Sequence, residues 1–82
     1  MSNAIPNPTE GNTRVNYTLP EGANTGEIVF CNQQGEEVKR FKVDRTFDHL
    51  LISTADLPAG SYFYQLQCGG TTIGGKKVIV VK

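Results

Sequence analysis

The sequence predicts an all-β sandwich of six or seven short, mainly antiparallel strands. Polar and apolar residues alternate over short stretches, as they do in strands that bury one face. Gly, Pro and Asn residues separate these stretches at intervals of roughly 8–12 residues, which is the spacing of turns in a sandwich. No stretch of the chain has the apolar repeat of an amphipathic helix, and residues 44–48 have room for one helical turn at most.

The first strand is expected at residues 14–19, which alternate strictly until a Pro-Glu-Gly stop. Residues 27–32 and 37–43 are the next two, and the former is rich in β-branched and aromatic side chains. Asn32 and Gly35 hold the first and last positions of the turn between them, as in a type I turn. These two strands are therefore expected to form a hairpin.

The second half of the chain continues the β pattern. Residues 49–53 are expected to form the fourth strand, and a Leu-Pro-Ala-Gly turn at 57–60 leads into the fifth. In this fifth strand, residues 61–67, every second side chain is a tyrosine or leucine, which marks a buried face. Glycine pairs flank residues 71–73, so residues 69–75 are expected to be a flexible loop with brief pairing at most.

The last strand is expected at residues 77–81, and its residues 78–81 are apolar on both faces. A strand with one buried face would alternate, so either both faces are covered or one face or edge awaits a partner. We favour a place for this strand in the domain's own sheet. Recognition is then left to its exposed groups, which include Lys82.

Length and charge restrict the function. The chain has 82 residues, enough for one domain, and eight basic residues balance eight acidic ones. A domain of this size buries only a small core, which argues against a deep catalytic cleft. The longest strongly apolar run, residues 78–81, is far shorter than the roughly 18 residues of a membrane-spanning helix. The balanced charge argues against nucleic acid as the main partner.

The chain divides into three parts. Residues 1–4 look like an expression leader, which would make the chain a piece of a longer protein. Residues 5–12 contain two X-Pro steps and a glycine, which favour an exposed, extended linker, and residues 13–82 form the domain. Proteases reach such linkers. The residues expected to be accessible to cleavage are Ile5, Pro6, Asn7 and Pro8.

No catalytic or metal site is predicted. A Ser-His-Asp arrangement would need His49 with Ser53 or Ser61 and with Asp48 or Asp44. His49 and Ser53 lie on one expected strand, about 13 Å apart, and the chain lacks a Gly-x-Ser-x-Gly elbow. The dense acidic loop that calcium needs around Asp44 and Asp48 is also missing.

Three charged motifs are interpreted as structural. Glu36 and Glu37 are neighbours on a strand and so point to opposite faces. Residues 74–76 have the Gly-Gly-Lys letters of a phosphate loop without its full spacing or its helix. Residues 39–42 mix basic and aromatic side chains, as single-strand nucleic-acid binders do, but an edge strand protected by Lys and Arg is the favoured interpretation.

Five segments in order carry a family resemblance. They are residues 5–8, 15–21, 28–38, 57–64 and 75–82. The resemblance that they carry extends over residues 5–82, and the last segment ends on Lys82. This string resembles the type A C-terminal sorting domain of the type IX secretion system of Bacteroidetes-type bacteria.

The resemblance implies an immunoglobulin-like β-sandwich that is the C-terminal address of a larger secreted protein. Such domains fold in the periplasm and are recognised by the translocon and shuttle proteins at the outer membrane. A cell-surface sortase then normally removes the domain, and the N-terminal cargo is attached to the surface or released. The resemblance implies no enzyme, no cofactor, no nucleic acid and no small-molecule substrate.

The family's motifs fall on specific residues. Its Asn-Pro start falls on Asn7 and Pro8, and its Pro-x-Gly-x-Tyr element begins within the 57–60 turn, on Pro58, Gly60 and Tyr62. Its lysine-flanked strand falls on residues 76–82. The residues implied in recognition by translocon or sortase are Pro58, Gly60, Tyr62, Lys76, Lys77, Val78, Ile79, Val80, Val81 and Lys82. The alternative is an immunoglobulin-like accessory binding or spacer module of a secreted enzyme. The chain has no Trp for the aromatic platform that carbohydrate binders usually offer.

The two cysteines are not expected to form a disulfide within the chain, and their spacing fits no zinc site. In an immunoglobulin-like arrangement, residues 27–32 run antiparallel beside residues 61–67. Cys31 then lies opposite the start of the later strand, roughly 20 Å from Cys68. A disulfide needs Cα atoms within about 7 Å.

Overall fold

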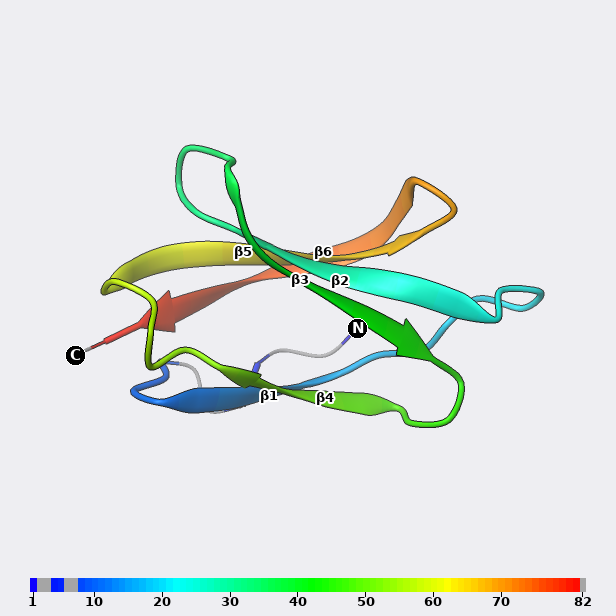
Figure 1. Ribbon diagram of the computed structural model, residues 1–82, viewed down its shortest axis with the longest axis horizontal. Helices are drawn as coiled ribbons and strands as arrows, with labels where there is room; N and C mark the ends of the chain where they lie inside the picture. The colour runs from blue at the N-terminus through cyan, green and yellow to red at the C-terminus, as the bar shows by residue number, and fades with distance from the viewer. Residues whose placement is uncertain (2–3, 6–7, 82) are drawn as a thin grey trace.

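All regular secondary structure among the described residues is β-strand (Figure 1). The structure is a computed structural model that describes residues 1, 4–5 and 8–81. Its strands are β1 (Asn12–Asn16), β2 (Thr25–Cys31), β3 (Glu37–Asp44), β4 (His49–Ser53), β5 (Gly60–Cys68) and β6 (Thr71–Val80). Because this part of the chain has no helix, it has none long and apolar enough to span a membrane. The all-β prediction is confirmed.

The strands form two antiparallel sheets, ordered β1-β4 and β3-β2-β5-β6. Figure 1 shows the two-stranded sheet facing the four-stranded one. In an immunoglobulin sandwich, strands B and E share one sheet, and strands C, F and G share the other. Here β1 and β4 correspond to B and E, while β2, β5 and β6 correspond to C, F and G. The extra strand β3 lies outside β2. The strand order of the two sheets thus confirms the prediction of an immunoglobulin-like β-sandwich.

The core lies between the two sheets. On β5, the predicted buried face is confirmed, and the ring of Tyr64 stacks on Phe30 of β2 with centroids 5.6 Å apart. Val15 of β1 and Ile52 of β4 face them from the short sheet and are fully buried. Aromatic stacking adds to the apolar burial that holds the two layers together.

The turn between β2 and β3 has the predicted type I form. The Gly35 amide donates to the Asn32 carbonyl oxygen at 3.0 Å. The Asn32 side-chain oxygen accepts from the amides of Gln34 and Glu36, both at 3.0 Å. A short polar side chain therefore closes the hairpin by satisfying the turn amides.

The predicted flexible loop at residues 69–75 is wrong. Gly69 and Gly70 have φ angles of +59° and +82° and form a two-residue turn between β5 and β6. Two positive φ angles fit the turn whose twist matches a hairpin. Gly74 and Gly75 lie inside β6, and a Cβ on Gly75 would sit 3.0 Å from the Tyr64 carbonyl oxygen. Close approach of the β5 backbone, rather than flexibility, explains this second glycine pair.

The first strand, expected at residues 14–19, begins two residues earlier and ends three residues earlier, at Asn12–Asn16. β1 pairs with β4 only over Asn12–Asn16, although Tyr17 and Leu19 continue the buried alternation. Beyond the strand, the Tyr17 hydroxyl donates to the Asp44 carbonyl oxygen at 3.1 Å. Burial raises the pKa of Tyr17, with the charge of Asp44 acting in the same direction.

Candidate functional site

The C-terminal strand β6 is an edge strand of the larger sheet, next to β5. Val78 lies opposite Tyr62 and Val80 opposite Gly60, and both valines are buried in the core. Ile79, between them, is 39% exposed, and Val81 is half-buried. The uniformly apolar end of the strand thus has one core face and one partly open face. The prediction that the last strand belongs to the domain's own sheet is confirmed, because β6 pairs with β5.

Two lysines precede the buried valines. Lys76 and Lys77 are exposed and lie opposite Tyr64 and Phe63 of β5. With Phe63 and Gly75 they line a shallow hollow of about 350 Å³. Missing side-chain volume at Gly75 helps to open it, and the hollow combines an aromatic wall with two cations. Such a surface suits a partner that carries acidic and apolar groups. Lys82 lies outside the described residues.

The Pro-x-Gly-x-Tyr element forms a corner rather than a surface motif. Tyr62 is 5% exposed, and its hydroxyl donates to the Pro58 carbonyl oxygen at 2.6 Å. A tyrosine near the start of strand F that bonds back to the chain upstream is a hallmark of immunoglobulin sandwiches. Gly60 has a φ of +154° and lies opposite Val80. The corner therefore supports the end of β6, and only Pro58 of the three is exposed.

The residues expected to be accessible to cleavage lie next to the short sheet. Ile5 is 63% exposed and pairs antiparallel with Arg14 of β1. Pro8 is exposed, whereas Pro6 and Asn7 lie outside the described residues. Ile5 and Pro8 are thus exposed to solvent, although the same segment also contains the buried residues Ala4 and Thr9.

The remainder of the N-terminal segment is more ordered than the sequence suggested. Ala4 is buried in the core, and its backbone is hydrogen-bonded to Tyr64. Burial raises the pKa of Tyr64, and this hydrogen bond partly offsets the rise. Residues 1–4 were expected to stand outside the fold, but Ala4 belongs to its core.

Thr9 is the functional candidate that sequence reasoning missed. It is 1% exposed and pairs in parallel with Val80 of β6. The expectation of an exposed linker over residues 5–12 is therefore wrong at Thr9, and Asn12 already belongs to β1. A single paired residue has no periodicity. The neighbouring Pro8 and Gly11 indicate a linker, so no sequence signal marked it.

The charged run on β3 is engaged in structural contacts. Lys39 reaches across the sandwich and donates from Nζ to the Ser53 carbonyl oxygen and to Asp56, each at 2.8 Å. Arg40 forms ion pairs with Glu27 at 2.9 Å and Glu37 at 2.6 Å, and its hydrogen bond lowers the pKa of Glu37. This run protects an edge strand and joins the sheets, in agreement with the favoured interpretation.

The groups weighed for catalysis do not converge. His49 contacts Asp48 at 3.1 Å between Nδ1 and Oδ1, and this hydrogen bond lowers the pKa of Asp48. Ser53 stands at the other end of β4 from His49. Among residues 1, 4–5 and 8–81, no three His, Cys, Asp or Glu side chains gather as metal ligands would.

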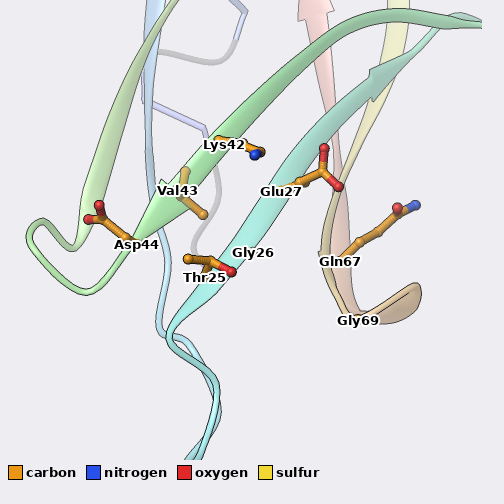
Figure 2. Close-up of a pocket in the computed structure, with 8 residues that line it drawn as sticks. All are labelled: Thr25, Gly26, Glu27, Lys42, Val43, Asp44, Gln67 and Gly69. Atoms are coloured by element: carbon orange, nitrogen blue, oxygen red, sulfur yellow. The ribbon is translucent and has the colours of Figure 1, made fainter.

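A second hollow of about 250 Å³ lies over one end of β2 and β3 (Figure 2). Figure 2 shows Lys42, Glu27 and Gln67 on three neighbouring strands, in agreement with their cross-strand register. Glu27 is already paired with Arg40. Because the charges in this hollow are mixed and partly neutralised, we do not assign it a ligand.

Comparison with known families identifies the chain. A family model described as the secretion system C-terminal sorting domain matches residues 3–81. No curated protein matches the chain. The matched segment contains all six strands of the sandwich, the tyrosine corner and the lysines of β6. The chain belongs to the family of secretion system C-terminal sorting domains and is a type IX secretion sorting signal.

Proposed function

We propose that this domain is the removable address of a larger secreted protein and has no catalytic role of its own. The family to which it belongs is a sorting-signal family and not a catalytic one. On this proposal the folded domain carries its N-terminal cargo to the outer membrane, where translocon and shuttle proteins recognise it. A cell-surface sortase then cuts the chain, and the cargo stays at the cell surface or is released.

The observation that carries the proposal is the division of labour along β6. Val78 and Val80 are buried and fix the strand in the sandwich, whereas Lys76 and Lys77 are exposed and lie opposite Tyr64 and Phe63. A binding partner can contact the lysines without unfolding the domain. We therefore assign recognition to the lysines and a structural role to the valines, Gly60 and Tyr62.

Processing is proposed at residues 5–8. The exposure of Ile5 and Pro8 supports access for a protease, and both precede the buried Thr9. A cut in this segment would separate the cargo and leave all six strands with the sorting domain.

The test is a reporter that is targeted to the periplasm and fused ahead of residues 5–82, in a bacterium with a type IX system. The double variant Lys76→Ala, Lys77→Ala is expected to leave the reporter in the periplasm. Its stability should stay within about 0.5 kcal/mol of the parent, as for other surface changes. Lys42→Ala is the matched control, because Lys42 is exposed on β3 at the other edge of the same sheet. Unchanged surface delivery of the double variant would refute recognition through these lysines.

A further inference from the structure

The outer edge of β6 is occupied by the chain's own N-terminal segment. The Thr9 amide donates to the Ile79 carbonyl oxygen at 2.8 Å, and the Val81 amide donates to the Thr9 carbonyl oxygen at 2.9 Å. These two bonds flank Val80 and form a parallel bridge, while β5 pairs with β6 antiparallel on the opposite side. Thr9 therefore acts as a one-residue strand next to β6.

The Thr9 side chain is held as closely as its backbone. Its hydroxyl donates to the Asn12 carbonyl oxygen at 2.6 Å and lies 3.3 Å from the Thr54 hydroxyl oxygen. Thr9 and Thr54 are both fully buried, at 1% and 0% exposure. The position beside Val80 thus selects a small side chain with a hydroxyl group, because an apolar side chain would leave Thr54 without this contact.

The backbone of this segment pairs with the strands at few described points, although Ala4 also packs in the core and the Gly11 carbonyl oxygen accepts from the Thr54 amide. Its described pairings with the strands are two isolated bridges, Ile5 with Arg14 and Thr9 with Val80. Between them, Pro8 is exposed. An isolated parallel bridge lacks the continuous ladder that stabilises a full strand, and strand addition at such an edge is a general way to bind extended peptides.

We infer that the edge of β6 at residues 79–81 is a strand-acceptor site, which the N-terminal segment of the chain covers through Thr9. Its ligand is an extended peptide that runs parallel to β6 and places Thr or Ser beside Val80. This contact uses backbone groups at the edge, unlike the lysine recognition proposed above. It goes beyond the proposed function, and a binding measurement on the purified domain tests it without any secretion step.

The experiment opens the site in the full chain. A protease recognition sequence is inserted between Glu10 and Gly11, where a Cβ on Gly11 would meet no atom within 4 Å. After cleavage and removal of the N-terminal fragment, hydrogen exchange is measured at the amides of Val81 and Val29. Exchange at Val81 is expected to rise by about tenfold or more, because its hydrogen bond to Thr9 is lost, and exchange at Val29 is expected to stay unchanged.

The probe is a synthetic peptide with the sequence of residues 4–10. Adding it to the cleaved protein should restore protection at Val81. The same peptide with Thr9→Val should bind about three- to tenfold more weakly, since it keeps the backbone bonds and loses the hydroxyl contacts. The uncut insertion variant is the control and must protect Val81 as the parent does.

Several results would overturn the inference. Removal of the fragment could leave Val81 protected, or the added peptide of residues 4–10 could fail to restore that protection. Val29 and Val81 could also lose protection together, which would make the segment an inseparable part of the core. Equal binding of the two peptides would refute the selection for a hydroxyl group.

A second pair of variants in the uncut chain gives an independent answer. Thr9→Pro removes the amide that donates to Ile79 and is expected to raise exchange at Val81. Thr9→Val keeps that amide and should raise it less. If Thr9→Pro unfolds the whole domain, the cleaved protein still decides the question.

Discussion

The hydroxyl of Tyr62 donates to the carbonyl oxygen of Pro58 across four residues, at 2.6 Å. This contact fixes the corner where the chain enters β5, the strand that pairs with both β2 and β6. Tyr62, one of the residues that the family resemblance implied in recognition, is thus buried. It supports the strand next to β6.

Tyr62→Phe is expected to destabilise the domain by about 0.5–1.5 kcal/mol, because the part-buried hydrogen bond to the Pro58 carbonyl oxygen is lost. Denaturant midpoints of parent and variant measure the effect. Export of a fused reporter should fall only as far as the folded fraction falls. A variant of parent stability that fails to be exported would instead assign Tyr62 to direct recognition.

Gly60→Val is expected to destabilise the domain by about 1–3 kcal/mol through its backbone. Gly60 has a φ of +154°, yet a Cβ there would meet no atom within 4 Å, so crowding is not the cause. Ala59→Val is the matched control, because Ala59 is exposed and has no positive φ. Equal denaturant midpoints for the two variants would show that Gly60 has no special backbone role.

Cys31 and Cys68 are expected to remain unlinked within one chain. The register places Cys31 opposite Phe63, five residues before Cys68, which corresponds to about 17 Å along β5. After unfolding without reductant, the monomer should take up two alkyl labels by intact mass. A monomer that takes up none would contradict the register between β2 and β5.

Alkaline pH is expected to weaken the fold through Tyr17 and Tyr64. Burial raises the pKa of both above the ordinary value of 10.0. The unfolded chain therefore loses these protons first, so their contribution to stability is complete below pH 10 and is lost as the pH rises through the folded values. Denaturant midpoints should fall above pH 10, and ultraviolet titration should show delayed ionisation in the folded state. Ionisation of all tyrosines at pH 10 in the folded domain would refute this.

The alternating strands could be predicted because each buries one face, as Tyr62 and Tyr64 of β5 do. The prediction of a flexible loop at residues 69–75 was wrong because a glycine can serve two purposes that look alike in sequence. It can make a loop flexible, or it can let a neighbouring strand backbone approach closely. Gly75 does the latter.

Two contacts across the molecule could not be predicted either. Thr9 pairs with Val80, and Lys39 reaches Ser53 and Asp56. Each joins segments far apart in the chain through one residue, and one residue leaves no periodic pattern. The lysine-flanked end of the chain was recognisable, but only the structure separates its buried Val78 and Val80 from its exposed Lys76.

The most direct test of the sorting role is removal of residues 78–82 from the reporter fusion. Val78 and Val80 are 0% and 1% exposed. Losing each is expected to cost about 1.5–3 kcal/mol, in a domain whose total stability is on the order of 5 kcal/mol. The fusion with residues 5–82 is expected at the cell surface, and the shortened fusion, with its sorting domain unfolded, is expected to stay in the periplasm. Surface delivery of the reporter without these five residues would contradict the assignment of the folded C-terminal strand as the sorting signal.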